Sequence, residues 1–98
     1  MIVAFSVAPE GNDESLAPAV ARAVRVVRES GLPNETSAMF TTVEGEWDEV
    51  MDVVKRATDA AGEGASRVSL TIKADIRDGV TDALHSKVDA VERELGDG

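Results

Sequence analysis

The segment 41–50 holds the residue types best suited to ligand chemistry in this 98-residue chain. Thr42, Glu44 and Glu46 occupy alternate positions, so a strand would place the hydroxyl and both carboxylates on one face. The chain's one tryptophan, Trp47, follows directly and opens a helical pattern. A hydroxyl and carboxylates beside an indole suit a small cationic or aminated ring. A solvated strand end followed by a core tryptophan is the alternative, and residue types alone leave both interpretations open.

Composition indicates one modest domain with an acidic surface. With 98 residues and 43% apolar content, the chain is expected to form a single domain over residues 1–98. Its 19 acidic residues exceed its 10 basic ones and give a net charge of −9, which disfavours nucleic acid and anionic membranes as partners. Abundant acids and scarce lysine are typical of a halophilic cytoplasm, where salt screens self-repulsion. A mesophilic protein with an acidic surface is the alternative.

The chain lacks residues that several chemistries require. The absence of cysteine excludes a disulfide framework, a thiolate nucleophile and a cysteine-based zinc site. His85 is the one histidine and is expected to be solvated rather than bound to a metal. The sequence contains no glycine-rich phosphate loop, nucleophile elbow or histidine-containing triad, so we expect neither catalysis nor a cofactor. No apolar run of about 18 residues and no signal-peptide pattern occur, which predicts a cytoplasmic protein.

Hydrophobic periodicity predicts alternating strands and helices. Strands are predicted over 2–8 and 67–74, and helices over 16–28, 47–61 and 80–95. The segment 34–46 could form one bent strand or two short strands, and two are preferred because about 13 residues is long for one strand. Trp47 falls on the apolar stripe of the second helix and is expected to face inward. Arg22, Arg25 and Arg28 repeat every three residues along the first helix. We expect them to pair with surface acids, and a phosphate site is the alternative.

This order of elements predicts an α+β fold, the ferredoxin-like βαββαβ sandwich with an extra C-terminal helix. Two β-α-β units with right-handed crossovers give an antiparallel sheet with both helices on one face. The other face of the sheet has no covering layer, so we expect it to pair with a second copy of the chain. The terminal helix carries its own apolar stripe and could dock on a neighbouring subunit.

Several segments, in order along the chain, resemble a small family of thiamine-binding proteins. They are Ile2-Val3-Ala4-Phe5-Ser6-Val7-Ala8-Pro9-Glu10-Gly11, Ser30-Gly31-Leu32, Thr42-Val43-Glu44-Gly45-Glu46-Trp47-Asp48-Glu49-Val50 and Ile72-Lys73-Ala74-Asp75-Ile76-Arg77. The resemblance covers nearly the whole chain, and the Thr-x-Glu-Gly-Glu segment is its best signature. It implies a ferredoxin-like fold, assembly into a homodimer or homotetramer, and non-catalytic binding of thiamine or its hydroxymethylpyrimidine part.

Given this resemblance, the candidate ligand-binding residues are Ser6, Thr42, Glu44, Trp47 and Asp75. The Glu44 carboxylate could accept a hydrogen bond from the 4-amino group of the pyrimidine, and the Ser6 and Thr42 hydroxyls could bind the pyrimidine edge. Trp47 could stack on a ring or make a cation–π contact with the thiazolium. Asp75 belongs either to the rim of the pocket or to an ion network between subunits. Each of these residues also has a purely structural alternative.

Three functions remain open at the level of sequence. The first is binding of thiamine or its pyrimidine moiety near the interface between sheet and neighbouring subunit, for vitamin storage, salvage or sensing. The second is a ferredoxin-like regulatory or interaction module that binds another small ligand at its oligomer interface, because fold alone does not choose the ligand. The third, a small enzyme of the dimeric ferredoxin-like type, is least supported because a nucleophile is missing.

Overall fold

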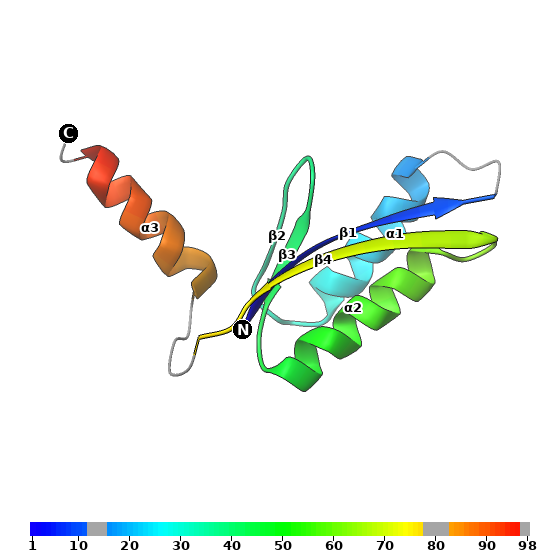
Figure 1. Ribbon diagram of the computed structural model, residues 1–98, viewed down its shortest axis with the longest axis horizontal. Helices are drawn as coiled ribbons and strands as arrows, with labels where there is room; N and C mark the ends of the chain where they lie inside the picture. The colour runs from blue at the N-terminus through cyan, green and yellow to red at the C-terminus, as the bar shows by residue number, and fades with distance from the viewer. Residues whose placement is uncertain (12–15, 78–82, 97–98) are drawn as a thin grey trace.

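The chain alternates strands and helices as the periodicity predicted, and it ends in an additional helix (Figure 1). The structure is a computed structural model that describes residues 1–11, 16–77 and 83–96. Its elements are β1 (Ile2–Glu10), α1 (Leu16–Glu29), β2 (Asn34–Thr36), β3 (Thr41–Glu44), α2 (Trp47–Ala61), β4 (Arg67–Asp75) and α3 (Ala83–Gly96). The predicted ferredoxin-like α+β sandwich with a C-terminal helix is thereby confirmed. Val80, at the predicted start of the last helix, lies outside the described residues.

The sheet has the strand order β2-β3-β1-β4, and all neighbouring strands are antiparallel. β1 pairs with β4 along its whole length, from Ile2↔Asp75 to Glu10↔Arg67. Its pairing with β3 is much shorter and ends at Phe5↔Thr41. The segment 6–10 of β1 therefore has a strand partner on only one side, which leaves room beside it at the β3 edge.

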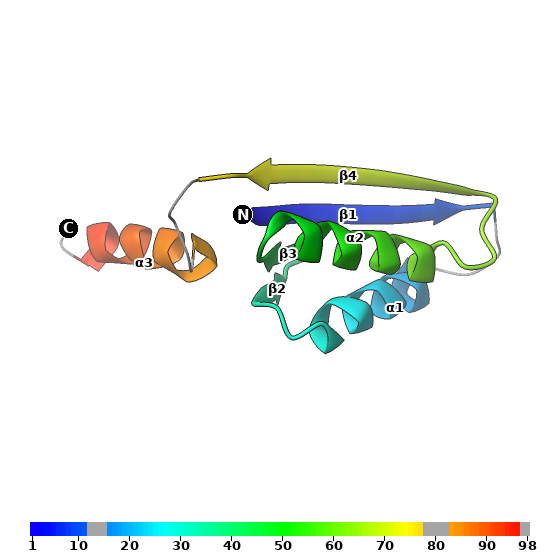
Figure 2. The ribbon, with the colours of Figure 1, turned by 90° about the horizontal axis from the view of Figure 1, so that it is seen from below.

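Both sandwich helices lie on the same face of the sheet, as Figure 2 shows. β1 buries alternate residues towards them, and the same face of β3 adds Val43. The core consists of Val3, Phe5, Val7, Ala23, Val27, Val43, Val50, Val53, Val54, Ala57 and Ala61. Valine and alanine dominate this set because the chain has few aromatic residues, so the two layers pack through many small contacts.

The two ends of α2 are stabilised by different parts of the chain. At its start, Glu46 is the N-cap and its backbone N–H donates to Glu49 Oε1 at 3.1 Å, part of a capping box. At its end, the Arg22 guanidinium on α1 donates to the carbonyl oxygens of Ala60 (2.8 Å) and Ala61 (3.4 Å). Arg22 thus satisfies carbonyls that a helix terminus leaves without intrahelical partners. Arg22 also makes the predicted pairing with a surface acid, because its Nε lies 3.9 Å from Oε2 of the exposed Glu63.

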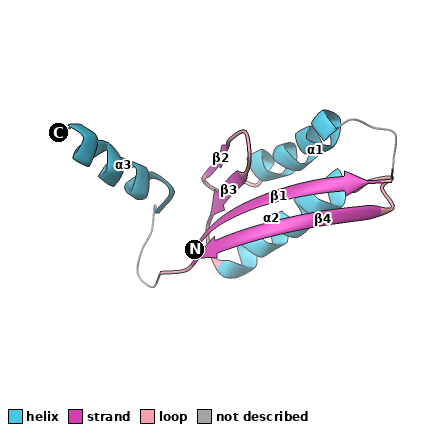
Figure 3. Cartoon of the chain, turned by 45° about the horizontal axis from the view of Figure 1, so that its top comes forward, coloured by secondary structure: helices cyan, strands magenta, loops and turns pink. Residues whose placement is uncertain are grey.

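The expectation that Trp47 faces inward is wrong. Trp47 is 56% exposed, although its spacing placed it on the apolar stripe of α2. Helical side chains lean towards the N-terminus, so the side chain of the first residue extends past the end of the packed layer. The apolar face of β4 is also incompletely covered, with Leu70 and Ile72 each 39% exposed. The helices pack over β1, which leaves the edge strand β4 at the margin of the layer (Figure 3).

Candidate functional site

The sheet face opposite α1 and α2 brings together most of the polar residues that the sequence indicated. Glu44 and Asp75 are both register partners of Ile2, so they flank it on either side. Their Cα atoms are therefore two strand spacings apart, roughly 10 Å. Thr42 lies beside Ala4 in the next row, and Ser6 follows one row further along β1. Ser6, Thr42, Glu44 and Asp75 thus share one face, which we call the open face.

Glu44 is buried, with only 6% of its surface exposed. Its Oε1 accepts a hydrogen bond from the backbone N–H of Leu84, in the first turn of α3, at 3.4 Å. A carboxylate is favoured there because the helix dipole places partial positive charge at the N-terminus. Leu84 is itself only 5% exposed. The alternative interpretation of Glu44 as a solvated strand-end residue is therefore wrong.

Two other members of the predicted cluster, Glu46 and Trp47, lie elsewhere. Glu46 leaves the strand and becomes the exposed N-cap of α2. Trp47 begins α2, which covers the opposite side of the sheet, so the structure does not place the indole on the open face with Thr42 and Glu44. Lys73 is on the open face, because it pairs with Ala4, and it is exposed there. The open face within one chain therefore has hydroxyls and charged groups without an aromatic wall.

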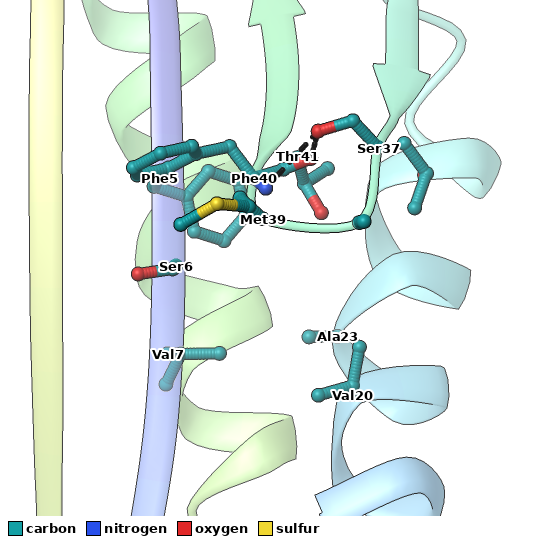
Figure 4. Close-up of a pocket in the computed structure, with 11 residues that line it drawn as sticks. Phe5, Ser6, Val7, Val20, Ala23, Ser37, Met39, Phe40 and Thr41 are labelled. Atoms are coloured by element: carbon teal, nitrogen blue, oxygen red, sulfur yellow. Dashed lines mark hydrogen bonds between the residues drawn. The ribbon is translucent and has the colours of Figure 1, made fainter.

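The structure also has a cavity of about 170 Å³ that the sequence had not indicated. It lies between β1, α1 and the loop that joins β2 to β3 (Figure 4). Its lining residues are Phe5, Ser6, Val7, Val20, Ala23, Thr36, Ser37, Ala38, Met39, Phe40 and Thr41. A signal was present in the sequence, because Met39 and Phe40 are apolar residues in a short turn, where polar residues are usual.

The loop over this cavity is held by Ser37. The Ser37 hydroxyl donates to the carbonyl oxygen of Phe40 at 3.1 Å and accepts from the Phe40 N–H at 3.2 Å. The backbone N–H of Ser37 donates to the same carbonyl at 2.8 Å. These bonds close the turn and fix Phe40 against the end of β3. Met39, at the tip, is 74% exposed.

The described part of the chain contains neither a metal-binding cluster nor a membrane-spanning helix. No group of histidine, aspartate and glutamate residues in ranges 1–11, 16–77 and 83–96 has the arrangement of a metal site. The side chain of His85 lies outside the described part, so its expected solvation is not tested. Among the same ranges, no helix combines the length and apolar character needed to cross a bilayer.

Comparison with known sequences identifies the family of this chain. A model of the family described as "Thiamine-binding protein" matches residues 3–92. The chain belongs to this family. A UPF0045 protein of Mycobacterium bovis is 56% identical over 96 residues, which is 97% of this chain and 94% of the relative. A UPF0045 protein of Synechocystis is 33% identical over 96 residues, covering 97% of this chain and 79% of the relative.

Solved structures of similar proteins share the fold. A Bacillus cereus domain of unknown function, DUF77, has a TM-score of 0.79 and 39% identity, with 89% of this chain and 85% of that chain covered. A Thermotoga maritima protein described as a candidate for thiamine biosynthesis or salvage has a TM-score of 0.78 and 30% identity, covering 92% and 96%. A hypothetical protein of Methanocaldococcus jannaschii has a TM-score of 0.83 and 28% identity, covering 93% and 94%.

Proposed function

We propose that this protein binds thiamine or its hydroxymethylpyrimidine moiety without catalysing a reaction on it. Membership of the thiamine-binding protein family supports this proposal, as does the similarity to the Thermotoga protein. The structural observation that carries it is the buried carboxylate of Glu44 on a face that also presents Thr42 and Ser6. The binding would serve vitamin storage, salvage or sensing in the cytoplasm.

The chemistry of the open face matches the two parts of thiamine. The Glu44 carboxylate can accept a hydrogen bond from the 4-amino group, while the Thr42 and Ser6 hydroxyls can both donate and accept at the pyrimidine edge. Asp75, on the other side of Ile2, adds negative charge that would attract the thiazolium cation. Trp47 lies at the same end of the sheet as Glu44. A ligand that extends beyond Glu44 could reach the Trp47 indole.

We also propose that the working form is a homodimer or homotetramer in which a second copy bounds the site. The open face has no layer above most of its length in Figure 2. Beyond its first turn, helix α3 extends away from the sandwich in Figure 1, and its apolar residues Val88, Val91 and Leu95 are 51%, 58% and 70% exposed. Exposed apolar residues that recur along one helix typically mark an interface. A second copy would cover both surfaces and supply the wall that one chain lacks.

Isothermal titration calorimetry in molar salt tests the proposed function. We expect saturable binding of thiamine, of hydroxymethylpyrimidine, or of both to the folded oligomer. The variant Glu44→Gln should weaken that binding at least tenfold, because it removes the charge while keeping size and shape. Glu29→Gln is the matched control, since Glu29 is exposed at the end of α1, on the helix side of the sheet.

Circular dichroism and light scattering should show that both variants keep the fold and the oligomeric state. The proposal is refuted if neither ligand binds to the folded wild-type oligomer, or if Glu44→Gln binds both as the wild type does. Tight binding of an amino acid or nucleotide, with no response to thiamine, would favour the regulatory module instead.

A further inference from the structure

We propose that two copies of this chain join edge to edge, by antiparallel pairing of β4 with the β4 of a second copy and with Thr71 on the two-fold axis. This edge is a different surface from the open face and from α3, and the inference does not depend on the choice of ligand. It is carried by the unpaired length of β4, the charges at its two ends and the apolar residues that the helices leave uncovered.

β4 is an exposed sheet edge that lacks most of the usual protection. It is the last strand in the order β2-β3-β1-β4, so among the described residues its outer side has no strand partner (Figure 3). Proteins commonly protect such an edge with a proline, a bulge or a very short strand. β4 has nine residues and no proline, and its register with β1 runs without a bulge from Glu10↔Arg67 to Ile2↔Asp75. A long edge of this kind is suited to main-chain pairing with another strand.

The sequence of β4 is self-complementary in one antiparallel register. Side chains directly opposite each other in an antiparallel pair lie on the same face and interact. When Thr71 lies opposite Thr71 of the second copy, an arginine meets an aspartate at each end of the paired strands. The opposed residues are then Arg67 with Asp75, Val68 with Ala74, Ser69 with Lys73 and Leu70 with Ile72, and symmetry repeats each pair. All of β4 is paired, and apolar residues oppose apolar residues.

The neighbouring registers set like charges opposite each other. Moving the axis by one residue towards the start of β4 opposes Arg67 to Lys73. Moving it by one residue towards the end opposes Arg67 to Arg77, just beyond the strand. Like charges directly opposite each other are destabilising. The charge pattern therefore selects Thr71 as the residue on the axis.

The same register covers apolar residues of β4 that one chain leaves exposed. Leu70 and Ile72 are on the helix face of the sheet, because they pair with Val7 and Phe5, yet each is 39% exposed. Helices α1 and α2 pack over β1 and leave the outer side of β4 open. In the dimer, Leu70 and Ile72 of both copies form one aliphatic cluster across the new strand pair. Burial of this cluster adds hydrophobic stabilisation to the main-chain hydrogen bonds of the pair.

Pairing also brings Arg67 of the second copy to the rim of the open face. Within its own chain, Arg67 Nη1 lies 3.9 Å from Glu10 Oε2, and the Arg67 side chain is 75% exposed. This loose contact leaves other N–H donors of the guanidinium for a second carboxylate. In the dimer that carboxylate belongs to Asp75, which flanks Ile2 on the side away from Glu44. Both copies thereby build the β4 rim of the open face.

Cysteine cross-linking tests the position of the axis, because the chain contains no cysteine of its own. Thr71→Cys should form a disulfide-linked dimer when the folded protein is oxidised with copper–phenanthroline in molar salt, since opposed Cβ atoms of an antiparallel pair lie about 4.5–5.5 Å apart. Ser69→Cys is the matched control, exposed on the same face of the same strand. In the proposed register its two copies lie about 13 Å apart along the strands, so it should run as a monomer on non-reducing gels. Absence of a Thr71→Cys dimer, or equal yields of dimer from both variants, would overturn the inference.

Exchange of the end charges provides a second test that needs no introduced thiol. Arg67→Asp and Asp75→Arg each set like charges opposite each other at both ends of the pair, and each should raise the Kd of the association about tenfold or more. The double variant restores opposite charges and should return the Kd close to that of the wild type. Analytical ultracentrifugation measures the Kd at the lowest salt concentration at which circular dichroism shows the native fold, because salt screens the pairs. A double variant that associates as weakly as the single variants would contradict the proposed register.

The outcomes separate this interface from the proposed function. A stable oligomer with neither the Thr71→Cys cross-link nor the charge rescue would overturn the β4 interface and leave the second copy over the open face in place. A Thr71→Cys dimer without a Ser69→Cys dimer supports the β4 interface whether or not the protein binds thiamine, because the measurement involves no ligand.

Discussion

Removing the guanidinium of Arg22 should destabilise the protein strongly, although Arg22 lies on a helix surface. Its Nε donates to the Ala60 carbonyl at 2.8 Å and its Nη2 to the Ala61 carbonyl at 3.4 Å. Its Nε also lies 3.9 Å from Glu63 Oε2, but Glu63 has a side chain that is 77% exposed. The Arg22→Ala variant leaves the C-terminal carbonyls of α2 without this donor and removes a bridge between the two helices.

The short hydrogen bond accounts for most of the expected loss. A hydrogen bond that involves a charged group contributes about 1.5–3 kcal/mol, and the longer bond to Ala61 adds little. The exposed pair with Glu63 contributes about 0–1 kcal/mol and is screened by salt. We therefore expect Arg22→Ala to lower the free energy of unfolding by about 2 kcal/mol. For a domain of this size that corresponds to a fall in Tm of about 8–16 °C.

Urea unfolding in molar salt, followed by circular dichroism at one fixed protomer concentration, measures this loss. Arg25→Ala is the matched control, because Arg25 is exposed on the same helix and should change stability by no more than about 0.5 kcal/mol. Arg22→Lys should fall between the two, since an ammonium can keep one contact but not the two-pronged geometry. Equal stabilities of Arg22→Ala and Arg25→Ala would refute the capping role of Arg22.

Three further results are expected. Gly11→Ala should lower the unfolding free energy by about 1–3 kcal/mol in thermal melts, because Gly11 has φ +87° and an added Cβ would overlap the Ser66 side chain. Gly64→Ala, with φ +78° and open surroundings, should lose less stability. Val91→Glu should reduce the mass measured by light scattering, whereas Glu92→Gln should not, and an unchanged oligomer would exclude α3 from the interface. The Tm should rise from low to molar salt, because the net charge of −9 causes self-repulsion and the Debye screening length falls from about 10 Å at 0.1 M to about 3 Å at 1 M. A flat or falling Tm would contradict the halophilic interpretation.

Much of the fold could be read from local patterns. Alternating apolar residues in β4 and the helical spacing of apolar residues in α1 and α2 predicted these elements, because side-chain periodicity follows backbone geometry within a few residues. Two short strands were preferred over one bent strand within 34–46 because about 13 residues is long for a single strand, and β2 and β3 confirm this. The ordered segments that resemble the thiamine-binding proteins were confirmed by the family match over residues 3–92. That match rests on the chain alone and required no coordinates.

Tertiary structure decided which of these residues are buried and which meet. Glu44 is a strand-end acid by pattern, but α3 begins against it from 40 residues away and makes it buried. Trp47 fits an apolar stripe, yet it extends beyond the layer that would have covered it. The cavity exists because β1 continues beyond its last pair with β3, Phe5↔Thr41. The lengths of the two strands and their register determine where this pairing ends. Periodicity assigns each residue to a face of its own element, whereas burial and cavities depend on where distant elements end, and only long-range packing sets that.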